Sequence, residues 1–595
     1  MTYTAPIADM RFAATRLAGF AEIAGLPGGE ELSEDLLASI LEQGGRFAAG
    51  VLAPLNRVGD RQGSRLENGV VRAPDGWSDA YRAFVEAGWN AVPFEPRHGG
   101  QGLPWLVAVA LQEMWHCASM AFALCPMLTQ AAVEAIGHHG SRALKERFLP
   151  KMISGAWTGT MNLTESQAGS DLAAVRTRAV RENGHYRITG QKIFITYGDH
   201  ELAENIVHLV LARLPDAPAG VKGISLFVVP KYLVDEDGSI GAHNDLRCVS
   251  LEEKMGIHAS PTAVMSYGDN GGALGLIVGE ENKGLQYMFT TMNNARLSVG
   301  LEGVGIAERA LQKAASFARE RVQGRDMAGH SPKPVTIIHH PDVRRMLLTM
   351  RALTEASRAL AYFAAGKLDL SRRHPDAAVR HRAQTVADLL VPVVKGWGTE
   401  VGSETASLGV QVHGGMGYIE ETGAAQFMRD AKIAEIYEGT NGIQANDLIG
   451  RKLTRDGGET AKAFIAEMRG LDGELAAARA NLAQLRFALG EGLTSLESVT
   501  DWILARQREE PRDAAAGAMS YLRLWGTVCG GWLMARAAIA AKANLAVGEG
   551  DPQFLRAKIV TARFYGEQIL PRASSLAAAA TAGAGTLMEM DDAAF

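Results

Sequence analysis

The chain has 595 residues, of which 47% are hydrophobic and 21% are charged. This length is too great for one hydrophobic core, so the chain is expected to form three or four domains of ordinary soluble composition. With 60 Lys+Arg against 66 Asp+Glu, the net charge of -6 excludes a general attraction to nucleic acid but leaves room for a local basic patch.

The cysteines and the lack of a recognisable targeting signal indicate in which compartment the protein is expected. The four cysteines are scattered and show neither a CxxC pair nor metal-ligand spacing, so reduced structural thiols and no metal site are expected. The first residues lack the basic region and apolar core of a signal peptide. The apolar run nearest in length to a membrane span, 528–547, is interrupted by Arg536 and Lys542. These features predict a cytoplasmic protein without a membrane span.

The first part of the chain is expected to be helical. Within 31–155, apolar residues recur at helical spacing, as in 36–41, and Gly/Pro-containing breaks such as 97–104 separate the elements. We therefore expect an N-terminal helical domain over residues 1–156.

The pattern changes to alternating β-like runs and turns near Trp157. Three such runs are 185–189, 206–211 and 224–229, and Asn183-Gly184 is a turn signal. A middle β domain is expected over 157–284.

Helical periodicity returns after the sheet region. Residues 343–353 form a clear amphipathic stripe within a predicted helical bundle over 285–455. The remaining residues, 456–595, are rich in Ala and Leu and are predicted to form a helical extension. This extension carries 14 Lys+Arg and 17 Asp+Glu, a net charge of -3.

A polar, Gly/Ser-containing segment lies where the helical block meets the sheet block. It reads Met161-Asn-Leu-Thr-Glu-Ser-Gln-Ala-Gly-Ser-Asp171, and its Ala and Gly allow the backbone to pass close to a flat or phosphorylated ligand. A polar surface loop is the alternative interpretation, because an isolated Gly/Ser loop is weak evidence. Segment 190–196, Gly-Gln-Lys-Ile-Phe-Ile-Thr, follows one strand later and would by itself be an ordinary core strand.

The most informative segment is Ala434-Glu-Ile-Tyr-Glu-Gly-Thr-Asn-Gly-Ile-Gln444. It places Glu438 in a short break followed by Gly439, so that the carboxylate can point into a cleft. Glu435, three residues upstream, is expected to lie on a helix that is still running and to be a solvated or paired surface charge.

These segments, in this order, resemble the acyl-CoA dehydrogenase family, and the resemblance covers roughly residues 31–455. It implies a mostly α fold with a central β domain: an N-terminal helical domain, a β-barrel-like sheet domain and a four-helix bundle. The helical extension is found only in larger members. The resemblance also implies that FAD is the cofactor.

By resemblance, several segments would contact FAD. The 161–171 loop resembles the flavin-binding loop, with Ser166 where the family usually has Pro, and Phe194 and Thr196 match an aromatic residue, usually Trp, and a Thr beside the isoalloxazine. Arg321, Gln323, His340 and the Gly-rich helix end 411–417 match positions that bind the ADP half, often from a neighbouring subunit. The implied cofactor-binding residues are Met161, Leu163, Thr164, Gly169, Ser170, Phe194, Thr196, Arg321, Gln323, His340, Gln411, Gly414, Gly415, Thr440 and Asn441.

The resemblance assigns Glu438 as the base that removes the α-proton of an acyl-CoA thioester while flavin N5 takes the β-hydride. The backbone N–H of Glu438 would help to polarise the thioester carbonyl, and burial should raise the pKa of its carboxyl toward the operating range. Some family members carry the base on another helix, just before an Arg that resembles Arg296. This chain has Ala295 there, which leaves Glu438 alone in the role.

Substrate contacts are implied for Ser170, Asn293, Arg296 and Gly439. Asn293 stands where the family often has Asp, and Arg296 either binds the CoA part or holds the adjacent loops together. His258, in the run 253–261, is expected to be a packing or surface residue rather than a base.

The expected activity is dehydrogenation of an acyl-CoA to a trans-2-enoyl-CoA, with electron-transfer flavoprotein as acceptor and a homodimer, or a dimer of dimers, as the assembly. Fatty-acyl and 3-methylthiopropanoyl thioesters both remain open as substrates. Two alternatives are a flavoprotein of this fold associated with nucleic acid, which the net charge of -3 after residue 455 disfavours, and an acyl-CoA oxidase.

Overall fold

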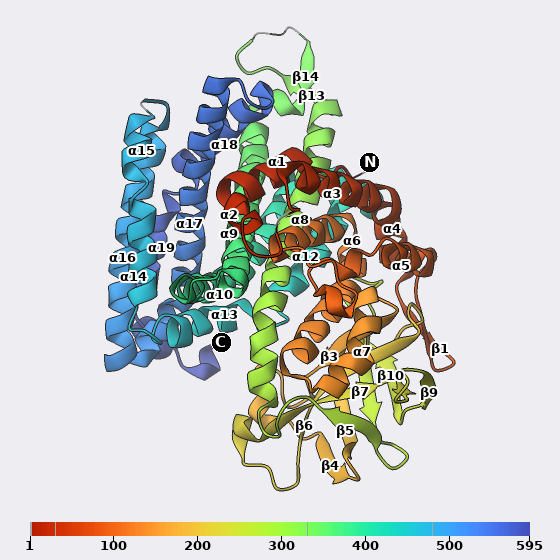
Figure 1. Ribbon diagram of the computed structural model, residues 1–595. Coiled ribbons are helices and arrows are strands. Elements are labelled where there is room, and N and C mark those ends of the chain that lie inside the picture. Colours follow the sequence, from red (N-terminus) through yellow and green to blue (C-terminus); the bar gives the residue numbers. More distant parts are fainter. Residues whose placement is uncertain (1–2, 30, 330, 332, 479) are drawn as a thin grey trace.

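The computed structural model describes residues 3–29, 31–329, 331, 333–478 and 480–595; the side chains of 289–293 and 480 lie outside this description. Helical segments precede and follow a sheet domain along the chain, and this sheet domain lies at one end of the molecule (Figure 1). The helices before the sheet are α1 Ile7–Phe12, α2 Phe20–Ala24, α3 Glu34–Phe47, α4 Ala53–Gln62, α5 Trp77–Glu86, α6 Trp105–His139 and α7 Arg142–Ser154.

One feature of this region differs from the expected helical domain over 1–156. The strand β1 (Arg65–Glu67) pairs with β2 (Val70–Arg72) as an antiparallel hairpin. Asn68 and Gly69 form its turn with φ of 52° and 79°. Asn-Gly favours such turns because both residues tolerate positive φ, and this local preference overrides the surrounding helical pattern.

Helix α6 belongs to the core. It is long and apolar enough to cross a membrane by length and composition, but 89% of its apolar window is buried inside the protein. The helix changes direction at Ser119, whose φ of -158° and ψ of 97° are not helical.

Eight of the strands described between residues 157 and 277 form one sheet. The order is β10-β11-β5-β12-β7-β6-β3, and β4 pairs with both β5 and β6, which closes the sheet into a barrel-like ring. The expected strands 185–189, 206–211 and 224–229 lie within β5, β6 and β7 and are confirmed. The bounds are β3 Trp157–Asn162, β4 Arg178–Glu182, β5 His185–Thr196, β6 Asn205–Arg213, β7 Ile224–Pro230, β10 Leu246–Leu251, β11 Thr262–Tyr267 and β12 Ala273–Ile277, with the small hairpin β8 Tyr232–Val234 and β9 Ile240–His243.

Long helices α8 and α10 pack face to face in the bundle that follows. A Cβ placed on Gly303 of α8 would lie 2.1 Å from the carbonyl oxygen of Gly398 on α10, so Gly allows the two backbones to meet. The hairpin of β13 and β14 projects from the far end of α8, at the opposite end of the molecule from the sheet domain (Figure 1). The bounds are α8 Gly284–Glu320, β13 Val322–Arg325, β14 Pro334–Thr336, α9 Pro341–Arg373, α10 Ala377–His413, α11 Gly415–Tyr418, α12 Ala424–Ala431 and α13 Asn441–Asp447.

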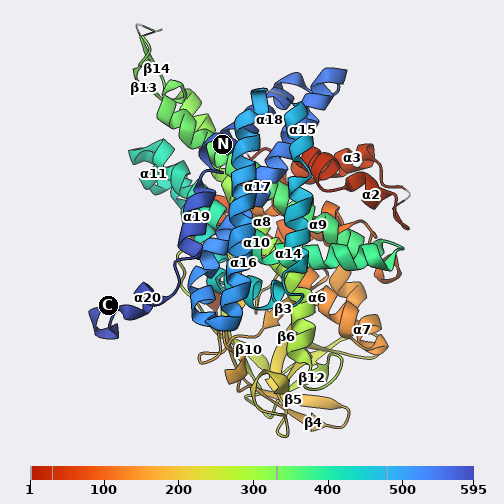
Figure 2. The ribbon, with the colours of Figure 1, turned by 90° about the vertical axis from the view of Figure 1, so that its left-hand side faces the viewer.

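The extension forms a further helical layer against this bundle (Figure 2). Its aromatic residues share the core of the bundle: the ring centroids of Trp532 and Phe363 lie 5.3 Å apart, and those of Trp532 and Phe464 lie 5.5 Å apart. The bounds are α14 Glu459–Arg469, α15 Asp472–Ala477, α16 Ala483–Glu509, α17 Pro511–Val547, α18 Pro552–Gln568, α19 Arg572–Ala580 and α20 Gly585–Glu589.

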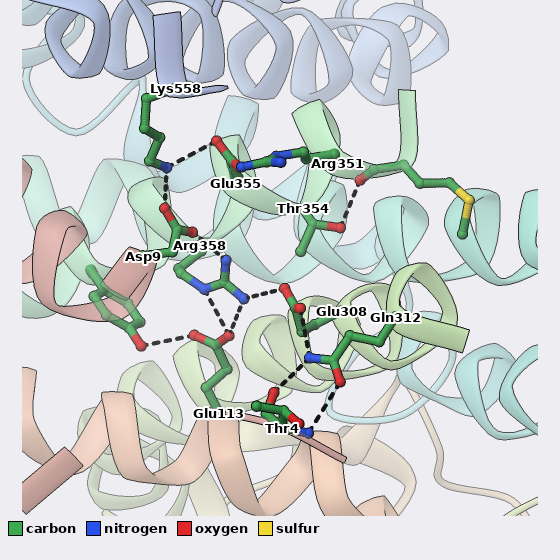
Figure 3. A network of polar contacts seen from close by, with 12 residues as sticks. Thr4, Asp9, Glu113, Glu308, Gln312, Arg351, Thr354, Glu355, Arg358 and Lys558 are labelled. Atoms are coloured by element: carbon green, nitrogen blue, oxygen red, sulfur yellow. Dashed lines mark hydrogen bonds and ion pairs between the residues drawn. The ribbon is translucent and has the colours of Figure 1, made fainter. Parts of the chain in front are cut away.

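A buried network of charges also ties the extension to the rest of the protein (Figure 3). Lys558 of α18 contacts Asp9 of α1, and its Nζ lies 2.9 Å from a carboxylate oxygen of Glu355 on α9. Arg358 of α9 joins Asp9 to Glu113 of α6 and Glu308 of α8. The extension is therefore an integral layer of the fold. The four cysteines are buried and free, as expected for reduced thiols.

Candidate active site

The turn that carries Glu438 is held by local hydrogen bonds. Glu438 and Gly439 have φ of 55° and 85°, and a Cβ on Gly439 would lie 2.8 Å from the amide nitrogen of Gln444. That amide donates to the carbonyls of Glu438 and Gly439 at 3.2 Å each. Thr440 caps α13 by accepting from the N–H of Ile443 at 3.2 Å. Left-handed backbone at a non-glycine residue is uncommon, and here the turn separates Glu438 from both neighbouring helices.

The surroundings of Glu438 act on its carboxyl in opposite directions. Dense surrounding protein raises its pKa, while the positive charges of Arg296 and Lys395 lower it, and the net shift is upward. Among the residues that the structure describes, the backbone N–H of Glu438 has no hydrogen-bond acceptor. A carboxyl with increased basicity therefore lies beside an uncommitted N–H donor.

A cavity of about 520 Å³ adjoins this turn through Arg296. Arg296 is buried on α8, donates to Asp447 of α13 at 2.8 Å, and so holds two elements together while it lines the cavity. Basic side chains dominate the wall: Lys222, Lys283, Arg296, Arg451, Lys452 and Arg455 face one acid, Asp447. The side chain of Asn293 lies outside the described residues.

The 161–171 loop is fixed by one buried ion pair. Glu165 lies 2.8 Å from Nζ of Lys192, and its carboxylate also accepts from the N–H groups of Arg176 and Thr177 at 2.7 and 3.0 Å. Burial alone would raise the pKa of Glu165, but Lys192 and these donors outweigh it and bring the pKa to about 2. The anchored loop leaves Gly169 with open space at its Cβ position.

Phe194 is turned outward by an irregularity in β5. The register between β5 and β11 shifts opposite this position, and Phe194 has a φ of 58°. Phe194 is 58% exposed although it lies within a strand. An exposed aromatic ring, two residues before Thr196 and beside an open, anchored Gly/Ser loop, fits a flat ring such as the isoalloxazine of FAD.

The other expected FAD contacts fall into a second group. Gln323 lies on the β13–β14 hairpin, and its carbonyl oxygen is 2.7 Å from Nε2 of His340. The Gly-rich end of α10 packs near the same end of α8, because His413 stacks on Phe317 with ring centroids 4.5 Å apart. Arg321, Gln411, Gly414 and Gly415 are exposed here. Figure 1 places this group far from the sheet domain that carries Phe194.

Three polar residues have structural contacts. Both ring nitrogens of His258 bond to backbone carbonyls, as expected for a packing residue. Glu435 contacts Ser403 and pairs with Lys432 at 2.8 Å, as expected for a paired surface charge. The side chain of Asn441 is buried and bonds to Lys395, Gly396 and Thr399, so an FAD contact would fall to its backbone.

Sequence reasoning missed two groups of residues. The basic cavity draws on three segments, 221–222, 282–296 and 447–455, and no single segment is strongly basic. Glu302 and Lys395 are buried next to the Glu438 turn. For Glu302 and Lys395, the signal available in the sequence was a charged residue within an otherwise apolar stretch of a predicted helix.

Family profiles match nearly the whole chain. They are the acyl-CoA dehydrogenase N-terminal domain over 39–156, the middle domain over 160–269, the C-terminal domain over 282–453 and an acetyl-CoA dehydrogenase C-terminal-like domain over 459–591. The chain belongs to the acyl-CoA dehydrogenase family.

Two relatives of this acyl-CoA dehydrogenase match it over nearly their whole length. It is 51% identical to 3-methylmercaptopropionyl-CoA dehydrogenase of Ruegeria pomeroyi, over 97% of each chain. It is 34% identical to the broad-specificity linear acyl-CoA dehydrogenase FadE5 of Mycobacterium tuberculosis, over 95% of this chain and 94% of the relative. An acyl-CoA dehydrogenase from Bacillus anthracis, solved in complex with FAD, shares the fold at a TM-score of 0.73 and 21% identity, over 98% of this chain and 92% of that one.

Proposed function

We propose that this acyl-CoA dehydrogenase uses FAD to introduce an α,β double bond into an acyl-CoA, with Glu438 as the base that removes the α-proton. The placement of Glu438 carries this proposal: its carboxyl has a raised pKa, it lies on a left-handed turn, and the charge of Arg296, which lines the basic cavity, acts on it. A base for a weak carbon acid must be ionised at the operating pH and still basic enough to accept a proton.

The same turn supplies help for the thioester carbonyl. The α-proton is weakly acidic, so removing it requires stabilisation of the negative charge that develops on the carbonyl oxygen. The N–H of Glu438 has no other acceptor among the described residues and is suited to donate to that oxygen. Gln444 keeps the turn rigid, so base and donor remain fixed relative to each other.

The basic cavity suits the CoA end of the substrate. Coenzyme A carries a pyrophosphate and a 3′-phosphate, and Lys and Arg side chains neutralise and hydrogen-bond such groups. Arg296 connects the two ends of the site, since it lines the cavity and also acts on the pKa of Glu438. Its ion pair with Asp447 holds it in place.

Phe194, Thr196 and the loop from Met161 to Ser170 would hold the flavin ring, and FAD, when bound, supplies the oxidising power for removal of the β-hydride. Arg321, Gln323, His340, Gln411, Gly414 and Gly415 would hold the ADP half of a cofactor bound mainly by a second subunit. Their separation from Phe194 within one chain supports a homodimer.

For the substrate we favour a short acyl thioester, with 3-methylmercaptopropionyl-CoA as first candidate, because the relative named for it matches over 97% of both chains. Linear acyl-CoAs are the second candidate on the likeness to FadE5. Electron-transfer flavoprotein as acceptor and a cytoplasmic location complete the proposal.

The test is anaerobic bleaching of bound FAD by acyl-CoAs of graded length, including the methylthio compound. Stoichiometric bleaching with at least one of them is expected; no bleaching with any would refute the dehydrogenase proposal. In air, a hydrogen peroxide yield that matches turnover would instead identify an oxidase, and salt-dependent retention on DNA would favour the nucleic-acid alternative.

A further inference from the structure

Glu302 is a buried carboxyl group next to the turn that carries Glu438 and Gly439, called the catalytic turn below. It lies on α8 with no exposed surface, and one of its oxygens accepts from the hydroxyl of Tyr437 at 2.5 Å. Its other oxygen, Oε1, is buried without a hydrogen-bond partner, and no Lys or Arg among the described residues lies within ion-pair distance. Buried carboxylates are normally paired or hydrogen-bonded through both oxygens, so this one needs an explanation.

The residue that Glu302 contacts directly precedes the base. Tyr437 is adjacent to Glu438, so the Glu302–Tyr437 hydrogen bond anchors the catalytic turn to α8. The close approach of α8 and α10 brings Lys395 to the same region, where its Nζ donates to Asn441 at 2.9 Å. Two buried ionisable groups, Glu302 and Lys395, therefore hydrogen-bond to residues on either side of Glu438, namely Tyr437 and Asn441.

Several charges act on this group of residues. The positive charge of Lys395 lowers the pKa of Glu302, and the negative charge of Glu438 raises it. Glu435 and Arg296 also act on Lys395. Asp430 of α12 acts on Tyr437. The charged groups that act on Glu302, Lys395 or Tyr437 are thus Arg296, Asp430, Glu435 and Glu438, together with Glu302 and Lys395 themselves.

We propose that Glu302 is a second proton-binding group of the catalytic centre: a positioning residue that holds Tyr437 and, by losing its own proton, increases the basicity of Glu438. This inference rests on the proposed role of Glu438 as the base. Glu302 does not touch the reacting atoms in this arrangement and acts through the turn and through its charge.

The direction of the effect follows from electrostatics. Burial raises the pKa of Glu302 to about 8, so the group is mainly neutral near pH 7 and ionises above pH 8. A new negative charge disfavours the ionised form of Glu438 and so makes it a stronger base. Burial also lowers the pKa of Lys395 to about 8, and loss of that positive charge acts in the same direction. Because both groups change charge in the same pH range, a variant is needed to isolate the part due to Glu302.

The kinetic test compares wild type with Glu302→Gln, which keeps an acceptor for Tyr437 but cannot ionise. The rate of anaerobic flavin reduction by the best acyl-CoA is measured at intervals from about pH 6.5 to about pH 9. The ratio of wild-type to variant rate should rise roughly three- to tenfold over this range, since a one-unit change in the pKa of the base is worth at most about tenfold. A ratio that stays constant with pH would show a merely structural role and overturn the proposal.

A spectroscopic test does not depend on turnover. Infrared difference spectra of the FAD-loaded, substrate-free protein should show the carbonyl stretch of a protonated carboxylic acid at pH 7 that disappears by about pH 9. This band should be missing in Glu302→Gln and present, at a shifted frequency, in Tyr437→Phe. An identical band in Glu302→Gln, or no such band in wild type, would overturn the proposal.

Failure of the proposed dehydrogenase function and failure of the proposed role of Glu302 give different results. If no acyl-CoA reduces the flavin, the proposed function fails, while the infrared titration still decides whether Glu302 binds a proton. FAD content and melting temperature are measured for each variant. If Glu302→Gln does not fold, the wild-type band and its frequency shift in Tyr437→Phe decide the assignment.

Discussion

Replacing Lys558 by Met should detach the extension locally from the rest of the fold. Lys558 is buried on α18 and contacts Asp9 and Glu355, so the substitution leaves two buried carboxylates with one cation fewer. Removing one partner of a buried ion pair costs about 3–5 kcal/mol, because the remaining charge loses its compensation. That corresponds to a change on the order of 10² or more in a local opening equilibrium.

The pH dependence of this loss has a defined sign. Burial alone would raise the pKa of Asp9, but Lys558 and Arg358 outweigh it and hold the pKa at about 2. Because this value lies below the unfolded value of about 4, the stabilisation is present above about pH 4 and is lost as the pH falls toward 2. The cost of Lys558→Met should therefore be greatest near neutrality and shrink below about pH 4.

Hydrogen exchange followed by mass spectrometry measures this locally, which matters because a chain of several domains does not unfold in two states. Amides of α18 and α1 should exchange on the order of 10² times faster or more in Lys558→Met. Lys462→Met is the matched control, since the ion pair of Lys462 with Asp501 in the same extension is about half exposed and worth about 0–1 kcal/mol. Equal exchange in α18 for the two variants would refute the reasoning.

Three further predictions concern the site. Lys222→Glu, a change of an exposed residue in the wall of the basic cavity, should raise the KM for acyl-CoA roughly tenfold with little change in kcat and a weaker dependence on salt, whereas Arg512→Glu, an exposed change in the extension, should leave KM unaltered. Phe194→Ala should weaken FAD retention by about 0.5–1.5 kcal/mol through loss of the exposed ring, seen as a lower flavin-to-protein ratio after gel filtration; full retention would contradict a ring contact. Lys192→Met should leave Glu165 buried without its cation, lower the melting temperature by several degrees and reduce FAD content, and an unchanged melting curve would show that this pair does not anchor the loop.

Patterns with short repeat lengths could be predicted from the sequence. Apolar alternation identified strands in β5, β6 and β7, and the helical stripe of 343–353 lies within α9. The hairpin at Asn68-Gly69 was not predicted. Asn-Gly is typical of a two-residue hairpin turn, but the segments on both sides have helical periodicity.

Features that depend on tertiary contacts could not be predicted. The outward turn of Phe194 arises from a register shift with β11, which is remote in sequence. The basic cavity is lined by residues from three separate segments, 221–222, 282–296 and 447–455, and Glu302 meets Tyr437 across 135 positions of the sequence. The sequence was enough to identify Glu438 as the candidate base. The burial and the neighbouring charges that shift the pKa of its carboxyl became visible only in the folded structure. The expected domain boundaries and FAD contacts remain predictions.

Replacement of Glu438, the proposed base, is the most direct test. Glu438→Gln keeps the size and hydrogen-bonding capacity of the side chain but removes its ability to accept the α-proton. In an anaerobic stopped-flow experiment, the variant should bind FAD as wild type does and bind acyl-CoA with similar affinity, while its flavin reduction falls by a factor on the order of 10³ or more. Flavin reduction by Glu438→Gln at a rate within tenfold of wild type would contradict the account.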